Sequence, residues 1–244
     1  MRTVVVIPTY NEAENLRPLA DALLANPDYG LLVVDDNSPD GTGAIADGLA
    51  EGYPGRVTVL HRAGKAGLGT AYVEGFRQAL RGESEYIVQM DADFSHSPAD
   101  VPRLVAALDN ADVAIGSRYV RGGGAENWPL IRWLVSRGGS RYTQLILGVS
   151  VQDPTSGFKC FRRDALARID LERINARGFG FQVEMNWRCH QRRLRVVEVP
   201  IRFVDRKLGQ SKMSSKIFFE ALVLVWQLRF RGSSGAERPN LTPS

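Results

Sequence analysis

Cysteine is scarce in this chain of 244 residues, which contains only Cys160 and Cys189. The two cysteines form neither a paired framework nor the close spacing of a structural metal site. A signal peptide is also missing, because MRTVVVIP leads directly into an apolar, strand-like run. We therefore expect a protein that works in a reducing cytosol.

Long uninterrupted apolar runs are absent as well. A membrane-spanning helix needs roughly 20 consecutive apolar residues, and charges interrupt the two apolar stretches of the second half, residues 128–149 and 212–231. Both fit helices that lie in a membrane interface, and for the first an amphipathic helix that covers the sheet is an equal alternative. The first stretch combines Trp128, Trp133, Leu134 and Leu145 with Arg132, Arg137 and Arg141, and the second combines Phe218, Phe219, Leu222 and Trp226 with Lys212, Lys216, Arg229 and Arg231.

Neither sign of charge is in large excess, since 31 Lys and Arg oppose 27 Asp and Glu for a net charge of +4. This balance suits an anionic small molecule or an acidic membrane surface as readily as nucleic acid. The hydrophobic content of 44% is ordinary for a globular protein of this length. We expect one domain over residues 1–231 and a disordered tail over residues 232–244.

The first half of the chain alternates apolar runs with segments of helical periodicity. Strands are expected at TVVVIP, GLLVVDD, RVTVLH, YIVQMD and DVAIGSR. Helices are expected over NEAENLRPLADALLA and from about Thr42, Gly69 and Pro98. Strands that are buried on both faces and joined by helices predict an α/β fold with a doubly wound, mostly parallel sheet. In such sheets ligands bind beyond the carboxyl ends of the strands.

Two aspartates follow the fourth apolar run, in MDADFSHSP. Residues two apart on a strand point the same way, so Asp91 and Asp93 could present two carboxylates to one hard cation. The alternative is that they form a turn and cap the next helix, since Asp and Ser favour both. The metal site is favoured because other polar residues gather at the same edge, namely Tyr10, Asn11, Glu12, Asp35, Asp36, Ser117 and Arg118.

Six motifs, in order, resemble one family. They are PTYNE (residues 8–12), VVDDNSPDGT (33–42), GLGTAYVEGF (67–76), MDADFSHSP (90–98), GSRY (116–119) and VDRKLGQSK (204–212). Together they resemble the inverting glycosyltransferases of family 2 and, within it, the dolichol-phosphate mannose synthase (polyprenol monophosphomannose synthase) group. The resemblance extends from about Arg2 to about Lys216.

The resemblance implies a GT-A fold and inverting transfer of mannose from GDP-mannose to a polyprenyl phosphate. Residues 1–120 would form the nucleotide-binding half, and residues 121–231 the half that faces the acceptor and the membrane. A divalent ion, Mg²⁺ or Mn²⁺, is implied, with Asp91, Asp93 and Ser95 as ligands; some relatives carry Gln at the last position. The implied contacts to the donor nucleotide come from Pro8, Tyr10, Glu12, Val34, Asp36 and Ala92.

The resemblance also implies cations for the phosphate groups. Arg118, Arg206 and Lys212 would complete the catalytic set with Asp91 and Asp93, because guanidinium and ammonium groups neutralise a pyrophosphate leaving group. The acceptor phosphate would meet Arg118, Arg132, Ser156 and Glu184. Asp153 and Gly157 are further candidates, whereas Lys65 and His96 receive no role.

The acceptor needs little activation in this chemistry. A phosphate monoester is already anionic near neutral pH, so its attack on the anomeric carbon requires no general base. Glu184 is therefore expected to be an acceptor-side or structural residue, and not a base. A lipid acceptor places the protein on the cytoplasmic face of the cell membrane as a peripheral protein, with no nucleic acid among its partners.

Other interpretations compete with this one. A processive polysaccharide synthase should carry Gln-x-x-Arg-Trp and transmembrane helices, and CHQRRLRVVEV supplies no Trp. A polyprenyl-phosphate glucosyltransferase that uses UDP-glucose, and an inactive nucleotide-sugar-binding membrane scaffold, both stay open. Residue by residue, Pro8 and Tyr10 could be strand-end packing, Asp36 a turn former, and Arg118 and Arg206 solvated surface charges.

Overall fold

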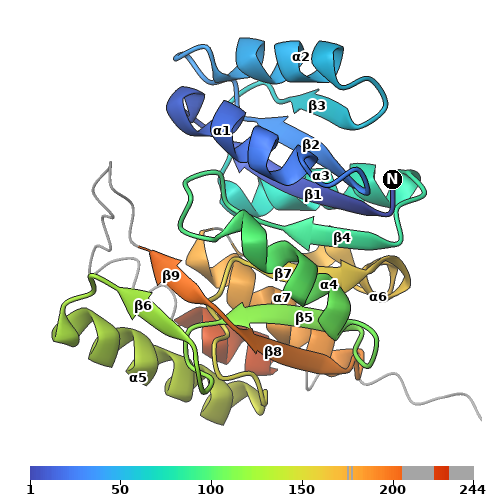
Figure 1. The fold of residues 1–244 in the computed structure, drawn as a ribbon. Coiled ribbons are helices and arrows are strands. Elements are labelled where there is room, and N and C mark those ends of the chain that lie inside the picture. Colours follow the sequence, from blue (N-terminus) through green and yellow to red (C-terminus); the bar gives the residue numbers. More distant parts are fainter. Residues whose placement is uncertain (175, 177, 205–222, 231–244) are drawn as a thin grey trace, which may run out of the picture.

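The computed structural model describes residues 1–174, 176, 178–204 and 223–230. Their core is a seven-stranded sheet in the order β3-β2-β1-β4-β7-β5-β8. The strands are β1 (Thr3–Thr9), β2 (Tyr29–Asp35), β3 (Val57–His61), β4 (Tyr86–Gln89), β5 (Val113–Ser117), β7 (Lys159–Arg162) and β8 (Val196–Pro200). All neighbours are parallel except β7, which is antiparallel to both β4 and β5. The predicted α/β fold with a mostly parallel sheet is confirmed (Figure 1).

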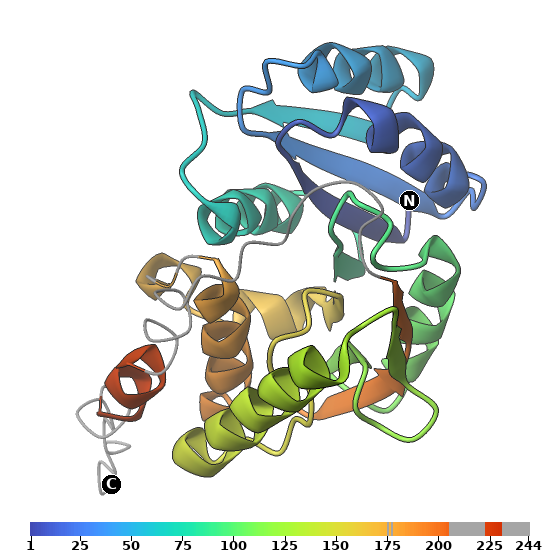
Figure 2. The same ribbon diagram turned by 90° about the vertical axis from the view of Figure 1, so that its left-hand side faces the viewer.

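Helices cover both faces of this sheet (Figure 2). One face packs against α1 (Ala13–Leu24), α2 (Thr42–Gly52) and α4 (Val101–Ala107), and the other against α3 (Leu68–Arg81), α6 (Arg163–Ala167) and α7 (Phe179–Gln191). Successive strand residues face opposite sides: in β1, Val5 and Ile7 belong to the first core, and Val4 and Val6 to the second. A doubly wound sheet has apolar residues on both faces for this reason, and its strands show as continuous apolar runs in the sequence.

Smaller elements complete the fold around this sheet. Short 3₁₀ helices lie at Pro98–Asp100 and Leu171–Arg173, and β6 (Gly124–Glu126) pairs in parallel with β9 (Arg202–Val204). Helix α5 (Leu130–Leu147) follows β6 and corresponds to the first of the two stretches expected to be amphipathic. The expected helix after Pro98 is therefore a 3₁₀ turn that continues into α4.

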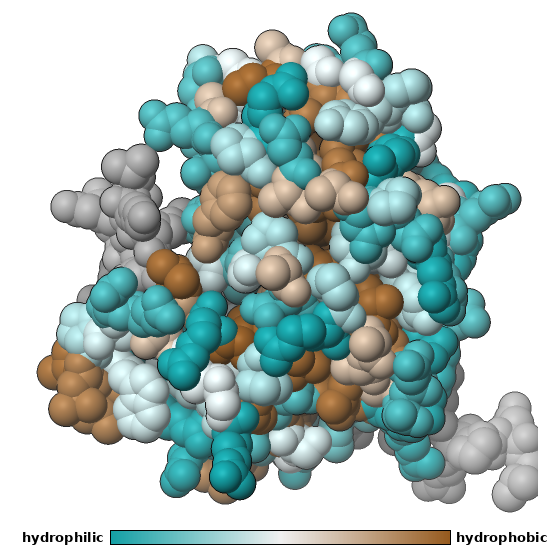
Figure 3. Space-filling model, in the orientation of Figure 1, coloured by the Kyte–Doolittle hydropathy of each residue, from teal (hydrophilic) through white to brown (hydrophobic). Residues whose placement is uncertain are grey.

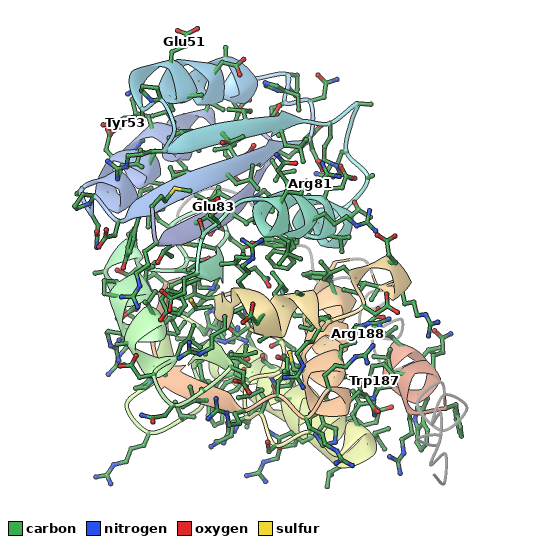
Figure 4. All side chains as sticks on the ribbon, turned by 90° about the vertical axis from the view of Figure 1, so that its right-hand side faces the viewer. Glu51, Tyr53, Arg81, Glu83, Trp187 and Arg188 are labelled. Atoms are coloured by element: carbon green, nitrogen blue, oxygen red, sulfur yellow. The ribbon has the colours of Figure 1, made fainter. Side chains whose placement is uncertain are left out.

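A third apolar cluster joins α5, α7 and the helical residues 223–230. Leu147 and Val149 meet Val183 and Trp187 of α7, together with Val225 and Leu228. Part of the predicted C-terminal helix is thus confirmed, and Figure 4 labels Trp187 beside it. None of the helices in the described ranges is long and apolar enough to cross a bilayer.

Several sequence predictions fall outside the described residues. They concern the cations Arg206, Lys212, Lys216 and Arg231, the apolar residues Phe218, Phe219 and Leu222, and the tail 232–244.

Candidate active site at the carboxyl edge of the sheet

Two carboxylates lie just beyond the carboxyl end of β4. The hydroxyl of Tyr72, on α3, donates a hydrogen bond to Asp91 Oδ1 over 2.7 Å. Asp93 Oδ1 accepts hydrogen bonds from the backbone N–H of Ser95 at 3.0 Å and from its hydroxyl at 2.6 Å. Burial raises the pKa of Tyr72 well above its usual value, and the charges of Asp91 and Asp93 raise it further. Each carboxylate is therefore oriented by a hydroxyl, Asp91 by that of Tyr72 and Asp93 by that of Ser95.

The turn after the carboxylates is held in place by local geometry. Phe94 has a φ of 58°, a left-handed conformation that few non-glycine residues adopt. Ser95 is buried and uses its hydroxyl to orient Asp93. Its predicted role as a metal ligand stays a prediction, and the turn-forming role named as an alternative is present in the structure. Ala92, between the two carboxylates, is buried.

The expected nucleotide side forms where β1 and β2 end. Pro8 and Val34 are partners in the strand register, and the Asp36 N–H donates to the carbonyl of Thr9 over 3.0 Å. Burial raises the pKa of Asp36, although the charge of Arg62 opposes this shift.

Arg62 is almost buried and forms an ion pair with Asp36. It also donates to the Thr70 hydroxyl at 2.8 Å and pairs with Glu74 at 3.1 Å. The sequence had suggested no role for Arg62. The carboxylate expected to bind guanosine is thus already oriented by a cation before any ligand arrives.

Tyr10 and Glu12 follow β1 at the same edge. The Tyr10 side chain is partly exposed, and Lys65 Nζ lies 3.9 Å from the centre of its ring. The Glu12 carboxylate accepts a hydrogen bond from Asn15 at 2.8 Å, and its backbone N–H donates to the Thr42 hydroxyl at 2.9 Å. Lys65, to which the sequence assigns no role, therefore lies beside Tyr10, one of the residues expected to contact the nucleotide.

Arg118 directly follows β5 and is buried against Asp153. Its Nε and Nη2 donate to the two carboxylate oxygens at 2.7 and 2.6 Å, and Nη2 also donates to Thr155 at 2.7 Å. Burial alone would raise the pKa of Asp153, but the charge and hydrogen bonds of Arg118 hold it below its usual value. The guanidinium also lies 5.2 Å from the ring centre of Trp128 and 5.4 Å from that of Phe203.

The burial of Arg118 excludes one of the two roles considered for it from the sequence. A solvated surface charge is wrong for this residue, because only 9% of its side chain is exposed. Its contact with a phosphate stays a prediction. In the structure, Arg118 joins the end of β5 to the loop before β7 through its hydrogen bonds with Asp153. Arg132, on α5, stacks on the same aromatic group, with its guanidinium 4.4 Å from the ring centre of Trp128.

The loop at residues 152–158 lies against the carboxylate site. The Ser156 hydroxyl donates to the carbonyl of Gly116 over 2.6 Å. A Cβ added to Gly157 would lie 3.1 Å from Asp91 Oδ2, closer than nearly all such contacts. The structure therefore brings Gly157, named from the sequence, next to Asp91, and ties Ser156 to β5.

Glu184 has a structural role in this arrangement. Its carboxylate is fully buried and accepts two hydrogen bonds from Arg188, one turn along α7, at 3.0 and 2.7 Å. It also accepts the N–H of Ala176 at 2.9 Å. Of the two roles expected from the sequence, the structure thus shows the structural one.

Two buried polar residues have no role in the sequence interpretation. His96 stacks on Phe158 at 5.0 Å, and burial lowers its pKa to about 4, so the ring is neutral at physiological pH. Lys159 is fully buried at the first position of β7 and donates to the carbonyl of Ser156 and to Gln182 Oε1, the latter at 2.5 Å. Because β7 has only four residues, its alternation of inward and outward side chains is too short for the sequence to predict where Lys159 lies.

A model of one family, described as glycosyl transferase family 2, matches residues 4–170. This chain belongs to glycosyl transferase family 2. It is 48% identical over 233 residues to polyprenol monophosphomannose synthase of Mycolicibacterium smegmatis, covering 95% of this chain and 88% of the relative. It is 49% identical over 235 residues to undecaprenyl-phosphate mannosyltransferase of Micrococcus luteus, covering 95% and 96%.

The same fold occurs in solved structures that share little sequence with this chain. One similar solved structure is glucosyl-3-phosphoglycerate synthase from Mycobacterium tuberculosis, in complex with Mn²⁺, UDP and glucosyl-3-phosphoglycerate. The two share 20% of their residues and superpose with a TM-score of 0.65, over 95% of this chain and 80% of that one. The predicted GT-A type is confirmed.

Proposed function

We propose that this glycosyltransferase transfers mannose from GDP-mannose to a polyprenyl phosphate with inversion at the anomeric carbon. One observation carries the proposal: the chain matches two relatives named for mannose transfer to polyprenyl phosphates over 95% of its length. The site supports it independently, because carboxylates, cations and buried aromatic residues meet at the edge of the sheet where ligands bind.

The carboxylates fit a divalent cation that is shared with the donor. In the described part of the chain no group of three or more His, Cys, Asp or Glu could hold a metal. Mg²⁺ in phosphate-transfer sites usually takes one or two carboxylates together with substrate phosphates. Asp91 and Asp93, two positions apart and each oriented by a neighbouring hydroxyl, suit such a shared site. A bound Mg²⁺ or Mn²⁺ would neutralise charge on the leaving diphosphate.

The residues at the ends of β1 and β2 would bind the nucleoside. Arg62 holds the Asp36 carboxylate in place, which leaves that group oriented to accept hydrogen bonds from ribose or guanine. Tyr10, partly exposed beside Lys65, offers an aromatic face and a nearby cation. Preorganised polar groups of this kind reduce the entropy that a ligand must lose on binding.

The acceptor side requires binding and not proton removal. A phosphate monoester carries its own negative charge near neutral pH, so a general base is unnecessary. The buried pair of Glu184 with Arg188 agrees with this, since that carboxylate serves the packing of α7. The loop at residues 152–158, tied to Arg118 through Asp153, would form the wall that faces the acceptor phosphate.

Helix α5 is suited to meet a membrane surface. Leu130, Ile131 and Leu134 are 73%, 74% and 54% exposed in its first turns, and Figure 3 shows a hydrophobic patch over that end of the helix. Arg132 and Arg137 lie on the same helix. Exposed apolar side chains next to cations are typical of interfacial helices that bind anionic lipids. Docking through α5 would present the acceptor edge to a lipid phosphate.

Transfer of a labelled sugar tests this function. The purified protein is incubated with a short-chain polyprenyl phosphate and a panel of radiolabelled GDP- and UDP-sugars, with Mn²⁺, with Mg²⁺ or with a chelator. We expect label from GDP-mannose to enter the lipid only when a divalent ion is present, and Asp91→Asn to abolish transfer. Transfer from UDP-glucose in preference to GDP-mannose would support the glucosyltransferase alternative instead, and no transfer from any donor would support the scaffold.

A further inference from the structure

Tyr72 is a buried residue in contact with the candidate metal site, and it has no role in the chemistry above. It lies in GLGTAYVEGF, one of the six motifs that resemble the family, and the resemblance assigns this tyrosine no role. Its side chain is fully buried on α3, and its hydroxyl donates to Asp91 Oδ1 over 2.7 Å.

The Tyr72 ring stacks on two other aromatic rings. Phe181 of α7 lies parallel to it, with ring centres 5.7 Å apart and an angle of 4° between the planes. Phe76, one turn along α3, lies on it at 5.8 Å and 28°. The start of α3 also lies close to the segment before α7, since a Cβ added to Gly69 would lie 2.7 Å from the carbonyl oxygen of Ala176. Full burial and these ring contacts restrict the Tyr72 side chain and so help to hold its hydroxyl in place.

Asp91 needs such a support because it lies beyond the end of β4. A carboxylate on a turn has two side-chain torsions to order, and a cation binds well only when the oxygens are held in place. Tyr72 contacts Oδ1 from the side of α3. The backbone at Gly157 lies near Oδ2, where an added Cβ would be 3.1 Å away. The carboxylate is thus bracketed by two separate parts of the fold.

We propose that Tyr72 is a positioning residue for the divalent cation, and that its hydroxyl sets the orientation in which Asp91 binds the ion. This inference rests on the proposed function, because it assumes that Asp91 is a metal ligand. Hydrogen-bond partners of metal ligands typically change metal affinity or activity by about 10–100-fold when they are removed. Tyr72 acts through Asp91 and touches neither substrate.

The decisive variant is Tyr72→Phe, which removes the hydroxyl and keeps the stacked ring. The matched control is Tyr86→Phe, at the opposite end of β4. Tyr86 is also buried, and its hydroxyl accepts a hydrogen bond from Arg2 at 3.2 Å. Both variants lose one buried hydroxyl, and only Tyr72→Phe loses a contact with Asp91.

Binding of Mn²⁺ to the full-length protein is measured by electron paramagnetic resonance, with GDP present and no acceptor. We expect Tyr72→Phe to bind Mn²⁺ about 10–100-fold more weakly than the wild type, and Tyr86→Phe to match the wild type. GDP binding measured by calorimetry without metal should be the same in all three proteins. In the transfer assay, Tyr72→Phe should need a higher metal concentration than the wild type for half-maximal activity. Its rate should be closer to that of the wild type at saturating metal than at low metal.

Mn²⁺ binding by Tyr72→Phe within threefold of the wild type overturns the inference. Circular dichroism checks that each variant is folded. If Tyr72→Phe fails to fold, Phe181→Leu replaces it, because this variant keeps the hydroxyl and removes the parallel ring. Weaker Mn²⁺ binding by Phe181→Leu then supports the inference, and unchanged binding overturns it. If wild-type protein binds no Mn²⁺ with GDP, or if Asp91→Asn binds it equally well, the metal assignment in the proposed function is itself wrong.

Discussion

Lys159 makes the stability of this protein depend on pH in a way that can be calculated. Its side chain is fully buried at the start of β7, and its ammonium donates to the carbonyl of Ser156 and to Gln182 Oε1. Burial lowers the pKa of Lys159 from its usual 10.5 to about 7. The folded state therefore releases this proton far more readily than the unfolded chain does.

The charges around Lys159 limit this shift without reversing it. Cys189, Asp153 and Asp91 raise its pKa, and Arg118 lowers it, but the loss of hydration is the largest effect. Between pH 7 and pH 10.5 the unfolded chain binds more protons than the folded one, so the free energy of unfolding rises with pH. With 1.36 kcal/mol for each pKa unit, integration from pH 7 to pH 9 adds about 2 kcal/mol of stability.

Lys159→Met isolates this contribution. Methionine has a similar length and no titratable group, so it can fill the buried space. Urea unfolding is followed at pH 7, 8 and 9 for both proteins. The change with pH is the informative quantity, because the offset between the two also contains the hydrogen bonds lost at Ser156 and Gln182, about 1–3 kcal/mol for each group left unpaired.

The stability of the wild type relative to Lys159→Met should rise by about 2 kcal/mol between pH 7 and pH 9. All other titrating groups are common to both proteins and cancel in this difference. Lys65→Met, at an exposed lysine, serves as the control and should run parallel to the wild type. Parallel curves for Lys159→Met as well would refute the reasoning, because the buried amine would then hold the same proton in both states throughout this range.

Three further outcomes are expected. Asp91→Asn should lose most transferase activity and its response to divalent ions while its circular dichroism stays unchanged; wild-type turnover would contradict the metal assignment. Arg62→Met should lower the free energy of unfolding by about 3–5 kcal/mol, because it leaves Asp36 buried without its cation; a urea midpoint equal to that of the wild type would contradict this. The double change of Ile131→Ser with Leu134→Ser should reduce sedimentation with anionic liposomes at low salt. It should leave transfer to a water-soluble short-chain acceptor unchanged. Sedimentation equal to that of the wild type would show that α5 does not contact the membrane.

Most of the parallel sheet could be predicted because its strands are continuous apolar runs. TVVVIP and YIVQMD became β1 and β4, and the helices between them begin within a few residues of their expected positions. These elements are specified locally, by side-chain period and by turn residues. The carboxylates after β4 were found for the same reason, since they directly follow a recognisable strand.

Contacts between distant segments could not be predicted in this way. Arg118 and Asp153 are 35 positions apart, and nothing in either motif shows that they form a buried pair. The pairing of Arg62 with Asp36 and the hydrogen bond from Tyr72 to Asp91 also depend on how α3 and the strands come together in space. Local period fixes which face a residue occupies, and tertiary packing decides which partner it meets there.

The antiparallel strand β7 explains why the loop at residues 152–158 was harder to predict. In a parallel sheet, residues that follow a strand lie at the carboxyl edge, and this rule identified the polar residues after β1, β2 and β4. Since β7 runs the other way, the residues before it reach that edge: Lys159 is opposite Gln89, the last residue of β4. The loop that contains Asp153 and Gly157 therefore arrives at the site from the amino end of a strand. A search of the sequence for polar residues after apolar runs passes over this loop, and only the reversed direction of one four-residue strand brings it against Asp91.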